Sequence, residues 1–307
     1  MVEAKNEGRE QCIRCDEYAA QRKPSLKFIA KVNGEVVDYC APGWLCESCG
    51  NIWSTAADED EHVRLSAEAY RKEHLLLTAA EMEEKRAMMG LTKSAFTNML
   101  GVPRVTYDRW LKGIVQGEAM DQALRAKLDE RAALFNSLRL TAQRFAELPS
   151  NLRGNTRPNL TALYSMIHFF VTQREEKEIG ELYLNKLCWY ADQIAFIDRG
   201  QSISGWPYVC LQFGPVISSY DQVFRSMILA GYLTEAAAHN FELGECAHEL
   251  PKLENSERDF LQQVWKAFGH RLKKLLKHSH DEVAWQKTAA FQEIDFSLSK
   301  RLLGMRK

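Results

Sequence analysis

Two short apolar-rich segments within the first 50 residues predict a β-hairpin. The apolar-rich segments LKFIAKV (26–32) and EVVDYC (35–40) flank the pair Asn33-Gly34. Asparagine followed by glycine tolerates the positive φ angles of a two-residue type I′ turn, which joins antiparallel strands. We therefore predict a small β-rich part at the start of the chain.

From residue 63 to residue 136 the apolar residues recur at helical spacing instead. Three short helices are predicted, over residues 79–89, 93–100 and 103–111. A capping threonine precedes each of the first two, and a proline opens the third. Two short helices joined by a turn that contains glycine are typical of the helix-turn-helix motif. The expected core positions of this motif are Leu91, Ala95, Met99, Val102, Val105 and Trp110.

After residue 158 the spacing is again helical, with one interruption. Asn159 is the expected cap of one helix, a capping box over residues 219–222 starts another, and a long helix runs from Ser256 through Lys277. The segment 202–217 mixes glycine, proline and aromatic residues and is predicted to be extended. The predicted fold class is therefore mainly α and multidomain, with a minor β component.

Local composition indicates where the domains meet. The acidic stretch 58–62 is expected to be a solvated surface segment, and PSNLRGNTRP (149–158) is the best linker candidate. We expect a small four-cysteine domain over residues 1–57, a helix-turn-helix domain over residues 63–148 and a mostly helical domain over residues 159–307.

Overall composition narrows the class of protein. Of the 307 residues, 46% are hydrophobic and 26% are charged, which is typical of a soluble globular protein. The 40 lysines and arginines nearly balance 41 aspartates and glutamates, so any nucleic-acid surface must be local. No apolar run is long enough to cross a bilayer, and the polar start MVEAKNEGRE lacks the apolar region of a signal peptide. We expect a cytoplasmic protein without a membrane partner.

Two cysteine pairs in the first domain predict a metal site. Cys12 and Cys15 form one CxxC pair, and Cys46 and Cys49 form a second. Two such pairs can complete a tetrahedral four-sulfur shell, which suits one structural Zn²⁺ per chain. Such a metal would staple a segment too short to bury a large core. Reduced cysteines without metal and a redox-active pair are the alternatives, and Cys40 could replace Cys46 in the shell.

The helix-turn-helix segment is locally basic in a nearly neutral chain. Residues 91–117 carry four positive side chains and one negative side chain. We expect Arg104 and Arg109, on the third helix, to enter the major groove of DNA, where arginine can pair with guanine. Thr106 is expected to contact a phosphate or a thymine methyl group, and Lys93 to contact a phosphate.

Both N-terminal parts resemble known families. The sequence GLTKSAFTNMLGVPRVTYDRWLKG (90–113) resembles the Xre/Cro-type helix-turn-helix family, and the four-cysteine segment resembles the zinc half of MqsA-type antitoxins, which have the same domain order. Together the resemblances cover residues 10–135. They imply a homodimer that binds a palindromic operator, often in its own promoter. Arg109 falls where the MqsA-type recognition helix also has arginine.

Three motifs stand out in the last part of the chain: KLCWYAD (186–192), QFGPV (212–216) and SHDEVAWQ (279–286). They resemble the Panacea domain of the SocA/GepA-like family over residues 158–300, except that Val283 stands where that family has proline. The resemblance implies a domain that neutralises toxins of toxin–antitoxin pairs, and some members act as proteolytic adaptors. Neither role requires catalysis.

Known catalytic motifs are absent from the sequence, which has no phosphate-binding Gly-Lys loop, HExxH, GxSxG or dinucleotide fingerprint. His278 and His280 could bind a metal or exchange protons, but a polar helix end is the favoured interpretation. We therefore predict a protein that is not an enzyme: a type II antitoxin that binds its cognate toxin and represses its own operon. The toxin-binding residues stay unassigned. A stand-alone transcriptional regulator or proteolytic adaptor is the alternative.

Overall fold

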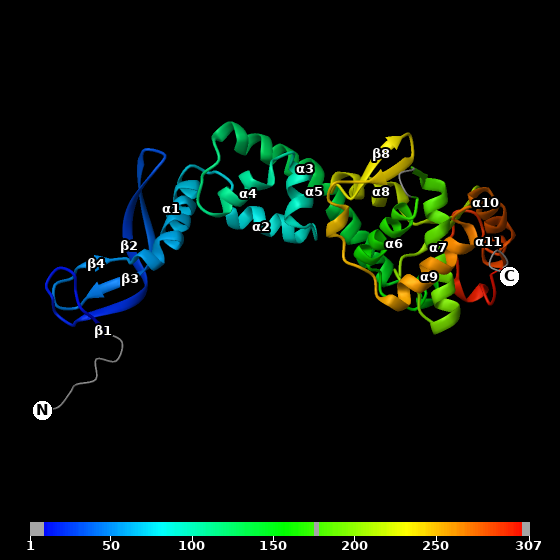
Figure 1. The fold of residues 1–307 in the computed structure, drawn as a ribbon, viewed down its shortest axis with the longest axis horizontal. Coiled ribbons are helices and arrows are strands. Elements are labelled where there is room, and N and C mark those ends of the chain that lie inside the picture. The colour runs from blue at the N-terminus through cyan, green and yellow to red at the C-terminus, as the bar shows by residue number, and fades with distance from the viewer. Residues whose placement is uncertain (1–8, 175–177, 303–307) are drawn as a thin grey trace, which may run out of the picture. The chain divides into compact units, whose positions relative to one another are not determined.

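The computed structural model describes residues 9–174 and 178–302 and confirms a mainly helical, multidomain fold (Figure 1). Its backbone contacts divide the chain into two compact units. Unit 1 comprises Met1–Ala87 and Leu100–Asp129, and unit 2 comprises Met88–Met99 and Glu130–Lys307. Each unit is described separately below.

Unit 1 begins with an antiparallel sheet of four strands in the order β1-β2-β3-β4. The strands are β1 (Arg9–Glu10), β2 (Ala20–Val32), β3 (Glu35–Cys46) and β4 (Ile52–Trp53). Val32 pairs with Glu35 across the predicted turn, where Asn33 and Gly34 have φ angles of 49° and 92°. The hairpin is thus confirmed, and its strands extend beyond the predicted segments until β3 reaches Cys46.

The helical part of unit 1 follows this sheet in the chain and packs on it through α1. It contains η1 (Ala56–Asp58), α1 (Glu59–Glu73), α2 (Ala79–Met88), α4 (Arg104–Leu111) and the first half of α5 (Glu118–Ala146). Helix α1 contacts β3, and Val37, Tyr70 and Leu76 form a small apolar cluster.

The acidic stretch 58–62 is only partly the solvated segment that its charge predicts. Asp58 is buried, closes a capping box with Thr55 and pairs with the Arg22 guanidinium, which holds the pKa of Asp58 well below its usual range. His62 is buried as well, and its Nδ1 lies 2.8 Å from the Tyr39 hydroxyl. The ends of the stretch therefore join α1 to the hairpin, whereas its three middle residues are exposed.

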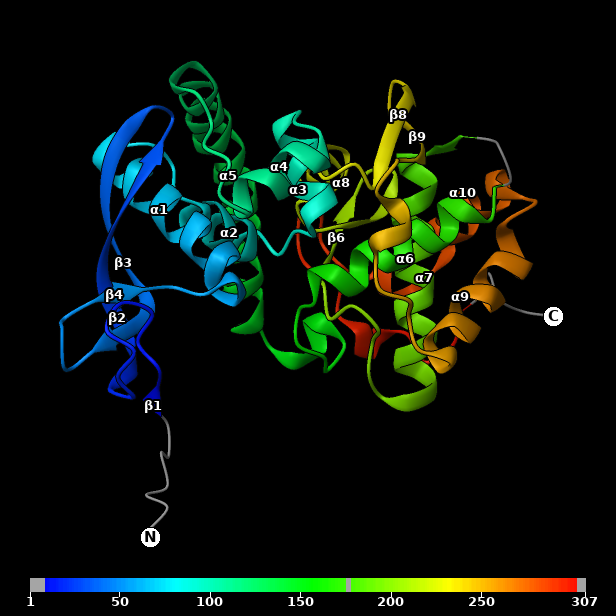
Figure 2. The same cartoon turned by 60° about the vertical axis from the view of Figure 1, so that its left-hand side comes forward.

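Unit 2 is built around α7 (Glu181–Arg199), in which residues 184–193 are all buried (Figure 2). Helix α7 contacts α6 (Leu160–Thr172), α9 (Asn255–Phe268), α10 (Leu272–Asp281) and strand β7. The other helical elements are α3 (Lys93–Leu100), the second half of α5, η2 (Ser150–Arg153), α8 (Tyr220–Leu229), η3 (Ala247–Glu249), α11 (Val283–Gln286) and η4 (Phe296–Leu298).

Two small antiparallel sheets complete unit 2. One has three strands in the order β5-β9-β8, namely β5 (Ile179–Gly180), β9 (Asn240–Leu243) and β8 (Leu233–Ala237). The other is the hairpin of β6 (Tyr208–Leu211) and β7 (Gly214–Ile217), which lies in the segment predicted to be extended. Gln212 and Phe213 form its turn.

Three local predictions are wrong. Val105 is 56% exposed, and the buried side chains of this region include Phe96 and Tyr107 instead. Ser219 adopts a left-handed conformation, with φ of 57°, and makes no capping hydrogen bond. The long helix after residue 255 breaks between Phe268 and Leu272, where a glycine lies against the ring of Trp265, and α10 then turns toward α7.

The segment for which composition predicts a linker, 149–158, is hydrogen-bonded within unit 2. The carbonyl groups of Arg153 and Gly154 accept hydrogen bonds from the hydroxyl and the backbone N–H of Ser202, at 3.0 and 2.8 Å. The Thr156 hydroxyl donates to the Ser202 carbonyl at 2.9 Å.

Candidate functional sites

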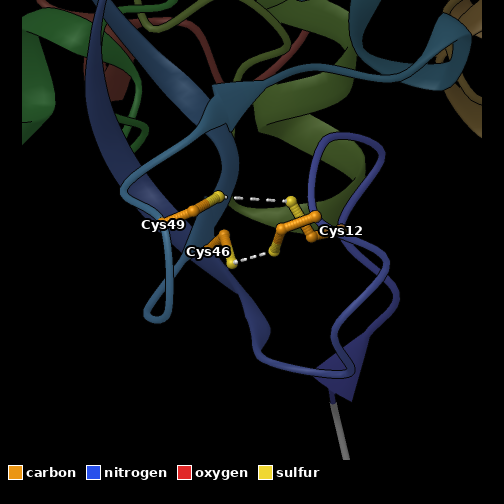
Figure 3. Close-up of side chains that lie close together, drawn as sticks. Cys12, Cys46 and Cys49 are labelled. Carbon is orange, nitrogen blue, oxygen red and sulfur yellow. Dashed lines mark hydrogen bonds between the residues drawn. The ribbon is translucent and has the colours of Figure 1, made fainter.

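The four predicted ligand cysteines lie together at one end of the N-terminal sheet (Figure 3). Their Sγ atoms all lie within 4.8 Å of one another, and the pairs Cys12–Cys49 and Cys15–Cys46 are both 3.7 Å apart. Cys40 lies within β3, is exposed and is not part of this cluster.

The sulfur spacing fits a four-thiolate metal site. Tetrahedral coordination with bonds of about 2.3 Å places neighbouring sulfurs about 3.8 Å apart, whereas a disulfide requires about 2.05 Å. The observed 3.7 Å separations agree with the first value and exclude the second. Four cysteines therefore form a candidate metal site, and a full shell of four protein ligands leaves no position for a reacting water.

The backbone folds both CxxC pairs into similar turns. The carbonyl oxygens of Cys12 and Cys46 accept hydrogen bonds from the N–H groups of Asp16 and Gly50, at 3.0 and 2.9 Å. Asp16 and Gly50 directly follow the second cysteine of each pair, and both have positive φ angles. Each turn thus points two sulfurs in one direction, and β3 delivers Cys46 to the site because it is the last residue of that strand.

The electrostatics of the cluster favour a thiolate at Cys12. Burial raises the pKa of this thiol, but hydrogen bonds from the backbone N–H groups of Arg14 and Cys15 and from the side chains of Cys15 and Cys49 together lower the pKa to about 6. The Arg14 N–H lies 3.4 Å from the Cys12 sulfur. Metals bind thiolates rather than thiols, so these donors prepare the site for a cation.

The predicted DNA-contacting residues lie on two helices. Arg104, Thr106 and Arg109 are on α4 in unit 1, where both arginines are exposed and Thr106 is half-buried. Arg104 pairs with Asp108 at 3.1 Å on the same helix. Lys93 begins α3, which belongs to unit 2.

A buried arginine that the sequence analysis missed supports α4. Arg71 of α1 is completely buried, and its guanidinium donates to the carbonyl oxygens of Trp110 and Ile114 at 2.9 and 2.7 Å. It also binds Glu68 at 2.5 Å and Gln116 at 3.0 Å. The end of α4 is thereby held through its backbone. The sequence places Arg71 on the apolar side of its helix, but its charge alone suggests an ordinary surface residue.

The three C-terminal motifs are separated by up to 90 residues in the chain and converge in unit 2 around α7. The Tyr190 hydroxyl of the first motif donates to Glu282 of the third at 2.9 Å. The Trp285 indole N–H of the third motif donates to the carbonyl of Leu211 at 3.2 Å, next to the second motif. Asn185, just before the first motif, accepts the N–H of Ile217 at 2.9 Å.

Asp192, the last residue of the first motif, organises the segment that follows α7. It is completely buried and accepts hydrogen bonds from the N–H groups of Ile203 and Ser204, at 2.6 and 2.9 Å. The hydroxyls of Ser204 and Tyr208 donate to its other oxygen at 2.6 and 2.7 Å. Burial raises the pKa of Asp192, and these four donors oppose that rise.

His278 and His280, the alternative candidates for a metal or acid–base site, occupy different environments. His278 lies 4.0 Å from Asp281, and the ring of His280 lies tilted against the ring of Trp285, with centroids 4.7 Å apart. Within the described part of the chain, the four-cysteine cluster is the one group of three or more potential ligands whose atoms lie close together.

A groove of about 470 Å³ lies elsewhere in unit 2, between α6 and the segment that leads into α9. Its lining combines apolar side chains such as Phe169 and Leu253 with the cationic Lys252 and Arg258. Burial lowers the pKa of His168, which also lines it.

Comparison with known proteins supports one part of this picture. The family described as "Antitoxin SocA-like, Panacea domain" matches residues 184–286, which contain all three C-terminal motifs. No curated protein and no solved structure matches the chain. Among the described residues, no helix combines the length and apolar character needed to span a membrane. Residues 184–286 thus form a Panacea-type, antitoxin-like domain.

Proposed function

We propose that the chain is the antitoxin of a type II toxin–antitoxin system and not an enzyme. In this proposal residues 159–307 bind and neutralise a protein toxin. The observation that carries it is the match of residues 184–286 to an antitoxin family, together with the packing of all three motifs around α7. The N-terminal residues would bind the promoter and keep expression in step with toxin supply.

Neutralisation is tested by expressing the product of the adjacent gene from an inducible promoter, with or without the full-length chain. We expect that gene product to arrest growth and the chain to restore it through a complex that can be purified. A matched variant with Arg104→Ala and Arg109→Ala should still restore growth, because neutralisation would not use DNA. Growth arrest that persists in the presence of folded wild-type chain would refute the proposal.

We further propose that α4 is the recognition helix of a dimeric repressor. Its support is the exposure of Arg104 and Arg109 on one short helix whose end is held by Arg71. In a mobility-shift experiment with the upstream promoter fragment, the double alanine variant should lose specific binding, since each arginine–guanine contact contributes about 1–3 kcal/mol. Arg64→Ala, an exposed arginine on α1, is the control and should shift the fragment normally. Sedimentation of the free chain tests the dimer.

Zinc is the metal that we propose for the four-cysteine site, because a tetrahedral all-sulfur shell suits it best. Metal analysis of the purified chain should give one zinc per chain. Replacement by Co²⁺ should give the absorption of tetrahedral thiolate coordination. Iron or no metal in a chain purified without chelators would contradict the assignment.

A further inference from the structure

Lys186, in the first Panacea motif, is completely buried in α7, yet its Nζ has no hydrogen-bond partner among the residues that the structure describes. Burial lowers the pKa of this lysine to about 7. A buried cation without a counterion is costly, and an apolar side chain of similar volume would avoid that cost. Packing alone therefore does not explain a lysine at this position.

Gly214, in the second motif, packs directly against this amine and leaves no room for a side chain. Its φ angle is 99°, and a Cβ built there would lie 2.9 Å from Cε and 3.3 Å from Nζ of Lys186. The same Cβ would lie 2.8 Å from the hydroxyl oxygen of Ser279, in the third motif. One residue from each motif thus meets at the same point, where the close packing depends on the absence of a side chain at position 214.

Three exposed apolar residues lie on the hairpin that contains Gly214 or in segments that are hydrogen-bonded to it. Phe213, in the β6–β7 turn, is 63% exposed, and Phe291, whose N–H donates to the Cys210 carbonyl of β6, is 78% exposed. Phe291 also has a φ angle of 67°, which is costly for a residue with a large side chain. Val283, at the start of α11, is exposed as well. We call Phe213, Val283 and Phe291 the turn surface.

We propose that the partner protein docks on the turn surface and places the carboxylate of an aspartate or glutamate beside Nζ of Lys186. This inference rests on the proposed antitoxin function and specifies where the toxin binds and which of its groups the domain recognises. Exposed aromatic anchors favour a protein as the source of the carboxylate over a free small acid. Because Lys186 is buried in the free chain, docking has to displace the Gln212-Phe213 turn.

The carboxylate would supply what Lys186 lacks in the free chain. It gives the ammonium a counterion and accepts charge-assisted hydrogen bonds in a site from which the docked surface excludes water. The Ser279 hydroxyl, which now donates to the Leu276 carbonyl at 2.8 Å, can turn and donate to the same ligand. The cost of the buried lysine in the free chain is then recovered in the complex.

Lys186→Met in the full-length chain tests the proposal, by calorimetric titration with the adjacent gene's product and by thermal unfolding. We expect toxin affinity to fall about 100-fold while the unfolding temperature stays equal or rises. Phe213→Ala and Phe291→Ala should each weaken binding about 10-fold. Arg258→Met, in the groove near α6, is the control and should bind like the wild type. Wild-type affinity of Lys186→Met, or a loss confined to Arg258→Met, would overturn the proposal.

A second measurement separates this inference from the proposed function. In a chain labelled with ¹³C at lysine Cε, the Lys186 signal is assigned by its absence from Lys186→Met. This signal is then followed in two separate titrations, one with the toxin and one with sodium acetate. If the wild-type chain binds no toxin, the proposed function fails, whatever acetate does. If toxin binds and raises the pKa of Lys186, the partner carboxylate is supported. If toxin binds without moving that signal but acetate moves it, the source is a free small acid and the partner proposal is wrong.

Discussion

The N-terminal sheet and the core of unit 2 are held together in different ways. Within residues 9–53, the buried apolar residues are Cys12, Ala20, Val37, Ala41 and Cys46, and two of these five are candidate metal ligands. Unit 2 completely buries large aromatic side chains, among them Trp189, Trp206 and Phe224. The sheet therefore has little apolar burial of its own and offers four sulfurs at one end as a candidate staple, whereas unit 2 depends on apolar burial and on hydrogen-bonded polar groups inside it.

This difference shows where each part can tolerate change. A small sheet with a metal loses its stability as a whole when one ligand is lost, because metal binding and folding are the same process. A large core loses stability in increments, because each substitution removes only a part of the free energy of unfolding. Such a core can tolerate a buried polar group such as Lys186 that, in our proposal, serves binding rather than folding. Four changes test this contrast.

The largest effect is expected from Cys46→Ser. Structural zinc contributes on the order of 10 kcal/mol to the folding of small metal-bound domains, so the variant should lose its metal and the sheet over residues 9–53 should unfold. Hydrogen exchange followed by mass spectrometry would detect this as rapid exchange in β2 and β3, with protection of α7 unchanged. Cys40→Ser is the matched control and should keep one metal per chain. A sheet that stays protected in Cys46→Ser would show that the contrast is wrong.

Asp192→Ala should give the largest effect within unit 2, about 4 kcal/mol, because it leaves two buried N–H groups and two hydroxyls without their acceptor. Asp198→Ala, an exposed position on the same helix, should change the stability by less than about 0.5 kcal/mol. Chemical denaturation of both variants provides the comparison. Equal stabilities would mean that the hydrogen bonds to Asp192 contribute little.

Lys186→Met should stabilise unit 2 by about 2 kcal/mol at pH 6. Since burial lowers the native pKa to about 7, the unfolded chain binds more protons than the native chain from about pH 7 up to the ordinary lysine pKa near 10.4. Wild-type stability therefore rises with pH across this range relative to the variant. The advantage of methionine should be constant below about pH 7 and shrink by pH 10, as measured by denaturation at several pH values. An advantage that does not change with pH would place the Lys186 ammonium in a solvated environment.

Gly34→Ala should have the smallest effect, about 1 kcal/mol, because alanine tolerates the φ of 92° poorly while the metal still holds the far end of the hairpin. Thermal unfolding of the metal-loaded variant measures it. The same substitution after metal removal should make no difference, because the sheet is then already unfolded. A loss as large as that of Cys46→Ser would mean that the turn, and not the metal, determines the fold of the sheet.

Features encoded in a few neighbouring residues could be predicted from the sequence. The Asn33-Gly34 turn needs only two residues with positive φ, and each CxxC pair bends its own backbone, so hairpin and cluster both follow from local pattern. The motifs of unit 2 indicated the antitoxin family in the same way. Resemblance, however, did not show that these motifs pack together, since their convergence depends on contacts across about 90 residues of chain.

Features that depend on tertiary packing could not be predicted. Asp58 and Arg71 are charged residues of the kind usually found on the surface, yet both are buried. Their burial depends on partners that lie 36 and up to 45 positions away in the chain, which a local sequence pattern does not reveal. Val105 has the spacing of a core residue, yet it faces solvent on a helix of eight residues, too short for apolar periodicity to define one face. Lys186 entered the sequence analysis only as the first letter of the motif at 186–192, and its burial became visible only in the structure.

The way in which Arg71 holds α4 has a consequence for testing the recognition role that we propose for this helix. Its guanidinium grips carbonyl oxygens of Trp110 and Ile114, which any amino acid would present, and not the side chains that point outward. The outward-facing positions 104, 105 and 109 can therefore be varied in libraries without disturbing this anchor. Under the proposed function, selection of such libraries against altered promoter fragments would exchange the recognition residues and leave the backbone of α4 in place.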